Sequence, residues 1–270
     1  MSSQAVDCNA LEATTSIEEI TGDEHNRDIL RSLQNDEVSE LWLCRPGLAS
    51  ASEDYELSNS RELDWLGHFV KKSTRLESFA IYGFGIFGNF DGQSVDRFLD
   101  DLSKCNHIQK MTFSFTDLAE TIYKLGPAMI NNNITRLVVE GCCLGVPGAT
   151  FPFNILSDVN NLEELCIDCE DNEDFTYLND TGMAGCIPSL AVCTGLRKLK
   201  LNGLNLSTNS CASLSAVFPR MAALLELDLC VNSIDDDCAR VVVRGLTDCK
   251  QVRSLDLSRN RISDDGLDVL

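Results

Sequence analysis

The sequence has few basic residues, few aromatic residues and no long apolar run. Lysine and arginine number 22 against 42 aspartates and glutamates, so the 270 residues carry a formal net charge of −20. A surface this acidic repels nucleic-acid phosphates, so binding to DNA or RNA is not expected. No stretch approaches the roughly 20 apolar residues of a membrane-spanning helix, and no contact with a membrane is expected either.

Motifs for catalysis are also missing. The chain has no GxxxxGK[ST] phosphate-binding loop, no G-x-S-x-G nucleophile elbow and no H-E-x-x-H zinc motif. The three histidines, His25, His68 and His107, are scattered, and none is placed to serve as a catalytic base. These absences predict a protein that is not an enzyme and that binds no cofactor.

The thirteen cysteines do not indicate disulfides. The first seven residues have neither a basic start nor an apolar stretch, so no secretory signal is expected. The thiols should then stay reduced in the cytoplasm, and a nuclear location is left open. Cys166 and Cys169 are spaced like a zinc-binding pair but have no second pair, and strand alternation would aim them at different faces. They are therefore expected to pack in the core.

What the sequence does contain is a repeat. Residues 224–234 and 252–262 share the pattern LxxLxLxxNxI, with Val252 in the first place of the second copy, and start 28 residues apart. Six further copies start at residues 38, 76, 108, 134, 162 and 196. A fixed period of this length predicts a solenoid of stacked units, here about eight.

The spacing inside one copy predicts a strand followed by a helix. Leu227 and Leu229 are two residues apart, so a strand would point both inward and would point Asp228 outward. The apolar residues of 238–246 then recur at helical intervals. One unit cannot bury its apolar edge alone, so the copies should stack with their strands parallel.

Three residues at the turn after the strand are expected to be structural: Asn232, Asn260 and Cys142. A buried side-chain amide there can bond backbone groups of neighbouring turns that would otherwise lack partners. A 28-residue unit with Asn or Cys at this turn resembles the ribonuclease-inhibitor-like class of leucine-rich-repeat proteins. The resemblance covers residues 134–270 well and residues 38–133 loosely.

The resemblance implies an α/β fold, a right-handed leucine-rich-repeat solenoid in the form of a horseshoe. Parallel strands would lie on its concave face and helices on its convex face. It also implies reduced cysteines and recognition of a protein partner on the concave face.

The repeat also sets the expected domain boundaries. Residues 1–25 are polar and acidic and are expected to be disordered, residues 26–37 to form an N-terminal capping helix, and residues 38–270 to form the repeat domain. The last repeat stops 19 residues into a 28-residue unit, which suggests a fragment of a longer array. Within the first repeat, Trp65 and Phe69 are expected to pack in the core.

Two segments interrupt the period, residues 80–92 and 168–188, and both are expected to form loops. The second begins with five carboxylates whose order does not match the EF-hand loop, so calcium binding there stays open. These five are Asp168, Glu170, Asp171, Glu173 and Asp174.

Residues that contact a protein partner are expected at the outward positions of the strands. These are Trp42, Tyr82, Lys110, Arg136, Glu140, Glu164, Asp168, Lys198, Lys200, Glu226, Asp228 and Asp256. Mixed charges with aromatics at one end are typical of a protein interface. The alternative is a sheet face that is merely solvated.

The expected function is a non-catalytic protein-binding module or adaptor that acts as a monomer. One alternative is a GTPase-activating protein of the Ran-activator type, which shares this repeat class; Arg45 would be its candidate residue. A second alternative is a protein inhibitor of a nuclease, in which an acidic concave surface imitates nucleic acid. Lys198 and Lys200 weaken that analogy.

Overall fold

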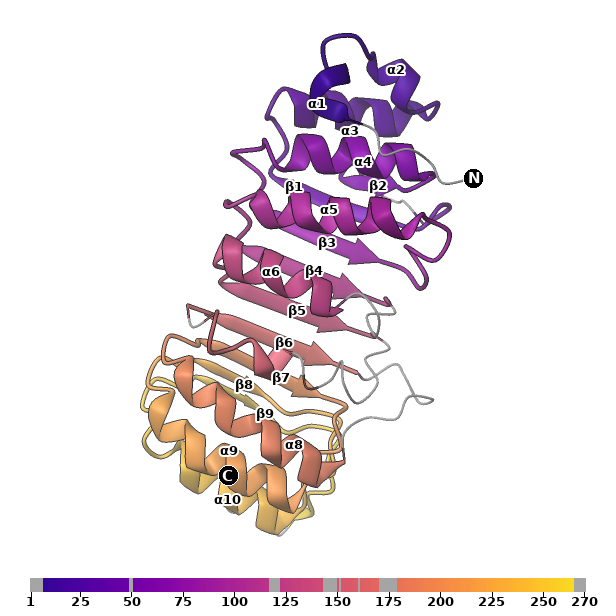
Figure 1. The fold of residues 1–270 in the computed structure, drawn as a ribbon. Helices are drawn as coiled ribbons and strands as arrows, with labels where there is room; N and C mark the ends of the chain where they lie inside the picture. Colours follow the sequence, from indigo (N-terminus) through magenta and orange to yellow (C-terminus); the bar gives the residue numbers. More distant parts are fainter. Residues whose placement is uncertain are drawn as a thin grey trace. The chain divides into compact units, whose positions relative to one another are not determined.

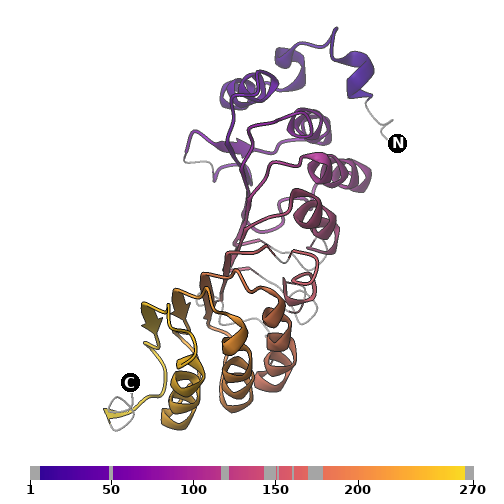
Figure 2. The same ribbon diagram turned by 90° about the vertical axis from the view of Figure 1, so that its left-hand side faces the viewer.

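The computed structural model describes residues 7–48, 51–116, 122–142, 150, 152–159, 161–169 and 179–264. The chain divides near residue 134 into two compact units. Each unit combines parallel strands with helices on one side of its sheet (Figures 1 and 2). We refer to the opposite side of each sheet, which carries the outward residues of the strands, as the strand face.

The first unit contains a parallel sheet in the order β2-β1-β3-β4. Its strands are β1 (Glu40–Cys44), β2 (Asp54–Glu56), β3 (Ser78–Tyr82) and β4 (Lys110–Ser114). Its covering helices are α4 (Ser60–Val70), α5 (Gly92–Lys104) and α6 (Ile122–Asn132), with α5 packed against both others. Each helix follows its strand in the chain, which is the unit that the repeat predicts.

The core of this unit lies between the sheet and the helices. Leu41, Phe79 and Met111 stand side by side on β1, β3 and β4, and none is exposed to solvent. On α4, Trp65 and Phe69 are four residues apart and are also buried. The expectation that both belong to the core is confirmed, because strand alternation and helical spacing turn these apolar side chains toward one another.

The N-terminal residues differ from the expected disordered segment. The chain forms α1 (Cys8–Leu11), α2 (Ile17–Ile20) and α3 (Glu24–Gln34), and Ile17 and Ile20 are buried. Ser16 and Glu19 form a reciprocal capping box at the start of α2. For residues 7–25 the expectation of disorder is therefore corrected to short, packed helices; residues 1–6 lie outside the described part of the chain.

Strand β2 was not expected from the repeat. It pairs with β1 in parallel, with Asp54 opposite Trp42 and Tyr55 opposite Leu43. The side chain of Asn26 on α3 binds both backbone groups of Glu56, donating to the oxygen at 2.8 Å and accepting from the nitrogen at 3.2 Å. These bonds occupy backbone groups that an edge strand would otherwise leave exposed.

The second unit contains five parallel strands that are neighbours in chain order. They are β5 (Arg136–Glu140), β6 (Glu164–Asp168), β7 (Lys198–Asn202), β8 (Glu226–Asp228) and β9 (Ser254–Asp256). The helices are α8 (Asp180–Cys186), α9 (Thr208–Val217) and α10 (Asp236–Leu246), with 3-10 turns η1 (Ile187–Val192) and η2 (Phe218–Arg220). Leu199, Leu227 and Leu255 are register partners on adjacent strands, as the repeat predicts.

Asn232 occupies the turn after β8 and is nearly buried. Its Oδ1 accepts from the amides of Leu204 and Leu206 at 3.1 and 3.0 Å. Its Nδ2 donates to the backbone oxygens of Leu201, Leu229 and Cys230 at 2.8 to 3.1 Å. The side chain thus joins the turns of two successive repeats.

Asn260 and Cys142 occupy the corresponding turns of their repeats. Asn260 Oδ1 accepts from the amide of Ile234, and its Nδ2 donates to the oxygen of Leu229, both in the preceding repeat. The Cys142 thiol is fully buried and donates to the oxygen of Glu140 at 3.3 Å. The asparagines therefore join two turns, whereas this thiol bond stays within one.

Asp180, the first residue of α8, caps the helix of the next repeat. Ser207, the residue before α9, provides no side-chain cap of its own. Instead the Asp180 carboxylate accepts from the amides of Ser207, Asn209 and Ser210 at 2.8 to 3.0 Å. A carboxylate at this end also interacts favourably with the helix dipole.

Replacing Asp180 with asparagine is expected to lower the free energy of unfolding at pH 7 by about 1–2 kcal/mol, because the amide keeps one accepting oxygen but loses the second acceptor and the negative charge at the start of α9. Burial alone would raise the pKa of Asp180, but the hydrogen bonds from Ser210 and from the amides of Ser207 and Asn209 lower it to about 2. This value lies below the value of about 3.9 for an unfolded aspartate. The stabilisation is therefore present above pH 3.9 and is lost as the pH falls through 2.

Urea unfolding at pH 7, 4 and 2.5 checks this. The difference between wild type and the Asp180→Asn variant should shrink toward pH 2.5, because the unfolded-state carboxyl is by then protonated while the folded-state carboxyl, with its pKa of about 2, is beginning to take up its proton. Asp248→Asn, an exposed aspartate outside any cap, serves as the matched control and should change little. A wild-type-to-variant difference that is the same at all three pH values would contradict the assignment.

Candidate protein-binding surface

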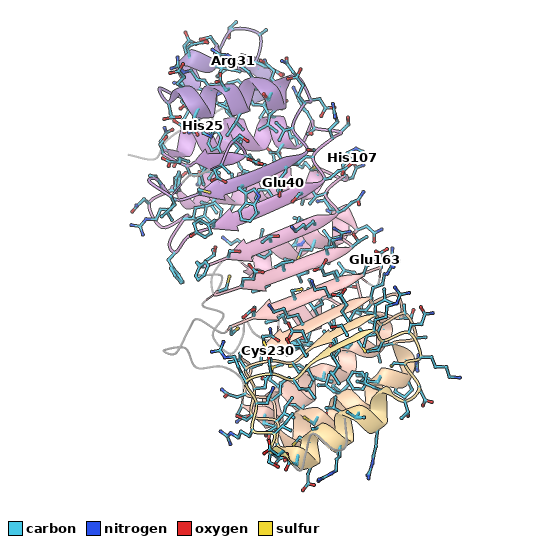
Figure 3. All side chains as sticks on the ribbon, turned by 180° about the vertical axis from the view of Figure 1, so that it is seen from behind. His25, Arg31, Glu40, His107, Glu163 and Cys230 are labelled. Atoms are coloured by element: carbon cyan, nitrogen blue, oxygen red, sulfur yellow. The ribbon has the colours of Figure 1, made fainter. Side chains whose placement is uncertain are left out.

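All twelve outward residues expected from the sequence lie on strands of the two units. Trp42, Tyr82 and Lys110 are on β1, β3 and β4 of the first unit, and the other nine are on β5 to β9 of the second. They alternate with inward residues, most of which are buried, such as Leu41, Leu137 and Leu227. Figure 3 shows the strand face with its side chains and labels Glu40 on the first unit.

Charges of opposite sign alternate along one row of the strand face of the second unit. Register partners Arg136, Glu164, Lys198 and Glu226 follow one another across β5 to β8. Their neighbouring charged atoms lie 3.9, 3.4 and 4.0 Å apart. Exposed pairs of this kind contribute about 0–1 kcal/mol each, so they matter more for partner choice than for stability.

A second charge group surrounds Lys200. Its Nζ lies 2.6 Å from Asp168 Oδ2 and 3.9 Å from Asp228 Oδ2. Burial alone would lower the pKa of Lys200, but the hydrogen bond with Asp168 and the charges of both aspartates raise it above its usual value. Asp228 also accepts from the Asn202 amide and from the backbone nitrogen of Cys230, each at 3.1 Å. Asp228 therefore also links β8 to the end of β7.

The outward residues of the second unit keep an acidic balance after this pairing. Three are cations, Arg136, Lys198 and Lys200, and six are anions. The anions are Glu140, Glu164, Asp168, Glu226, Asp228 and Asp256. The sum of 3 − 6 gives a formal charge of −3, which favours a basic partner surface.

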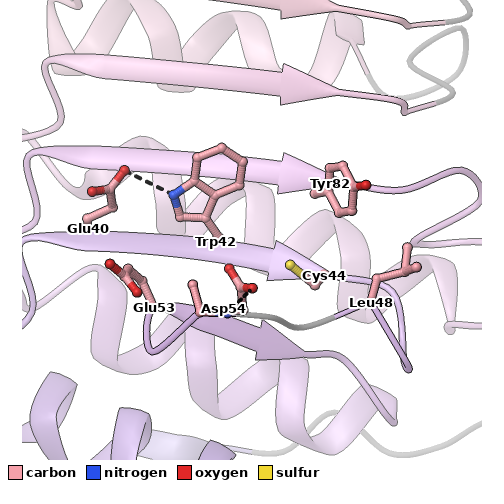
Figure 4. Close-up of a pocket in the computed structure, with 8 residues that line it drawn as sticks. Glu40, Trp42, Cys44, Leu48, Glu53, Asp54 and Tyr82 are labelled. Carbon is pink, nitrogen blue, oxygen red and sulfur yellow. Dashed lines mark hydrogen bonds between the residues drawn. The ribbon is translucent and has the colours of Figure 1, made fainter.

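The strand face of the first unit is hollowed by a pocket of about 410 Å³ (Figure 4). We call it the Trp42 pocket. Its lining includes the apolar side chains of Trp42, Tyr82 and Leu48 and the carboxylates of Glu40, Glu53 and Asp54. Trp42 Nε1 donates to Glu40 Oε1 at 2.9 Å, which fixes the indole beside the carboxylate.

The sequence predicts only part of this pocket. Trp42 and Tyr82 are found by strand alternation, and Glu40 could have been found by the same rule because it is two residues before Trp42. Glu53 and Asp54 carry no such signal, since they precede or begin β2, which departs from the repeat. Their contribution follows only from the pairing of β2 with β1.

Cys166 lies on β6, and Cys169 directly follows that strand. Cys166 and Cys169 are buried, and burial, followed by the nearby Glu164 and Asp168 charges respectively, raises the pKa of each thiol to about 12. Among the residues that the structure describes, no group of histidines, cysteines and carboxylates could hold a metal ion. Glu170, Asp171, Glu173 and Asp174 of the calcium hypothesis lie outside the described residues, and Asp168 pairs with Lys200.

Within the described ranges, no helix is both long and apolar enough to cross a membrane. The described helices are at most 13 residues long, the length of α5. This compares with the roughly 20 apolar residues that a bilayer requires.

Comparison with known proteins identifies the fold. No protein-family model and no curated protein matches the sequence. An internalin from Listeria monocytogenes superposes with a TM-score of 0.51 at 15% identity, over 90% of this chain and 68% of that chain. An internalin C2 from the same species gives a TM-score of 0.47 at 15% identity, over 93% of this chain and 90% of that chain. The strands are parallel, and each points leucine-rich apolar side chains toward the core. The chain is therefore a leucine-rich-repeat solenoid.

Proposed function

We propose that this chain is a non-catalytic protein-binding module that recognises its partner through the strand face. The observation that supports this most directly is the one-sided cover of each sheet: helices pack on one face, while the other carries charged and aromatic side chains (Figures 2 and 3). A sheet face with side chains at regular spacing offers a partner many contact positions.

The repeats are proposed to be of the ribonuclease-inhibitor-like type. Strands β7, β8 and β9 start at residues 198, 226 and 254, which are 28 residues apart. An α-helix follows each of β7 and β8, and Asn232 and Asn260 occupy the turns after β8 and β9. These features support the same class as the sequence pattern.

The partner is proposed to offer a basic surface to the second unit. The alternating row from Arg136 to Glu226 meets a complementary row best in one register, because a shift by one strand brings like charges together and a shift by two strands leaves half of the row unmatched. The remaining charge of −3 also steers a basic partner toward this face.

Replacing both Glu226 and Ser254 with lysine tests the role of the strand face. These exposed register partners on β8 and β9 gain three charge units together, which brings the formal charge of the face from −3 to 0. Affinity capture from native extract with quantitative mass spectrometry should show loss of the proteins that wild type retains. The thermal melt should move little, because exposed substitutions change stability by about 0.5 kcal/mol or less.

The matched control replaces Asp248 and Gln251 with lysine. Both residues are exposed, lie in the turns between α10 and β9, and gain the same three charge units. Capture of the same proteins in the same amounts by wild type and by the Glu226→Lys, Ser254→Lys variant would contradict the proposal. Equal losses in the test and control variants would show that the net charge of the protein matters and the face does not.

A further inference from the structure

The Trp42 pocket brings aromatic rings and carboxylates together without a cation. No lysine or arginine lines it among the residues that the structure describes. On the same face, Lys110 stands on β4, separated from Glu40 by Ser78 on the intervening strand. A cavity of about 410 Å³ with this lining is chemically suited to a positively charged group.

Both rings of the pocket are held in place before any partner binds. The Trp42 indole donates to Glu40 Oε1, and the hydroxyl of Ser78 donates to the same oxygen at 3.2 Å. The Tyr82 ring packs edge-on against Phe115, with ring centres 6.0 Å apart and planes at 85°. Fixed rings reduce the entropy lost on binding, so the pocket is pre-organised.

The negative charge of the pocket comes from carboxylates alone. Asp54 is buried and accepts from the backbone nitrogen of Ala51 at 2.9 Å, which fixes the carboxylate in the lining. Cys44 also lines the pocket, but burial and then the charge of Asp54 raise the pKa of its thiol to about 12, so it stays neutral. Glu40 and Glu53 complete the set.

A second hollow of about 510 Å³ lies beside the first, since Glu40 and Glu53 line both. It adds the carboxylates of Glu37 and Asp28, of which Asp28 already pairs with Arg31 at 2.9 Å, and no lysine or arginine lines it within the described ranges. Neighbouring acidic hollows of this combined size fit more than one basic side chain. They favour an extended segment of protein over a small cation.

We propose that the Trp42 pocket binds an arginine side chain on a basic, extended segment of the protein partner. The planar guanidinium can stack on the indole of Trp42 while its N–H groups bind carboxylate oxygens, whereas a lysine ammonium offers no plane to stack. A further basic residue of the same segment enters the neighbouring hollow. This inference rests on the proposed protein-binding function and names the chemistry of the partner.

Titration with the synthetic peptide acetyl-(Arg-Gly)3-amide tests the inference on the full chain. The readout is the indole N–H resonance of Trp42, assigned by its loss in the Trp42→Phe variant, with the buried Trp65 as an internal reference. The Trp42 resonance should shift saturably and that of Trp65 should not. The same peptide with citrulline, which keeps the shape of arginine but lacks its charge, should bind about tenfold more weakly.

Charge-removing variants locate the site. Glu53→Gln and Glu40→Gln keep the size of the side chain and should each weaken binding several-fold. Glu77→Gln removes the same charge from an exposed residue that lines neither hollow, and it should leave the affinity unchanged. Melting curves identify any variant that fails to fold, and the citrulline comparison needs no variant at all.

Several outcomes would overturn the inference. They are the absence of a Trp42 shift, equal binding of the citrulline peptide, or a loss in Glu77→Gln as large as that in Glu53→Gln. Binding of agmatine, a free guanidinium compound, as tight as that of the peptide would make this a small-cation site. These failures are distinct from failure of the proposed function, which is tested on β8 and β9 of the second unit.

Discussion

Replacing Leu227 with alanine is expected to lower the free energy of unfolding by about 2–5 kcal/mol, the usual range for a large-to-small change in a core. Leu227 is 1% exposed and stands on β8 between Leu199 of β7 and Leu255 of β9. Each repeat is one layer thick, so few residues can move into the space left behind. The cavity should therefore persist.

Leu255→Ala provides the matched control for this prediction. Leu255 holds the same position one repeat later but is only half-buried, so its truncation should destabilise clearly less. Urea unfolding followed by circular dichroism measures both variants, and an unchanged denaturant slope shows that the same cooperative unit is compared. A Leu227→Ala variant within 0.5 kcal/mol of wild type, or less destabilised than Leu255→Ala, would contradict this account of the core.

Replacing Asn232 with alanine is expected to destabilise the protein by about 1–3 kcal/mol. The change leaves the amides of Leu204 and Leu206 and three backbone oxygens without their Asn232 bonds in a turn that water enters poorly. Asn232→Asp keeps the accepting oxygen but loses the three donated bonds and adds a charge, so it should be at least as destabilising.

Thermal and urea unfolding of Asn232→Ala, Asn232→Asp and Ser233→Ala check this prediction. Ser233 is the neighbouring residue and uses only its backbone nitrogen, which donates to the oxygen of Leu206, so its change should be small. Equal stability of wild type and Asn232→Ala would mean that the side-chain bonds across the two repeats contribute nothing net.

The strands were predictable because one rule applies at every copy. Two inward apolar residues separated by one outward residue recur in all eight motifs. Each motif forms a strand in the structure, and these eight strands are β1 and β3 to β9. β2 could not be predicted in this way because Asp54–Glu56 places one apolar residue, Tyr55, between two acids. Its position depends on tertiary contacts with β1 and Asn26.

One N-terminal helix, α2, was predictable from a local motif, although the composition of the segment predicted disorder. Residues 16–19 read Ser-Ile-Glu-Glu, which is the S-x-x-E capping box, yet the acidic composition of the segment suggested disorder. The outward residues of the surface followed from alternation. The carboxylates of Glu53 and Asp54 in the Trp42 pocket did not, because Asp54 begins β2 and Glu53 directly precedes it, and β2 lies outside the repeat.

The cap that Asp180 supplies to α9 makes α9 depend on α8, although α10 carries its own cap at Asp235. A helix normally carries its own cap, so losing one helix leaves the next intact. Here the amides at the start of α9 depend on a carboxylate in α8, and the amide of Ser263 depends in the same way on Asp236 of α10. Fraying of α8 therefore removes the cap of α9, and fraying of α10 removes the bond to Ser263, so at these two steps local opening should spread more readily toward higher residue numbers than toward lower ones.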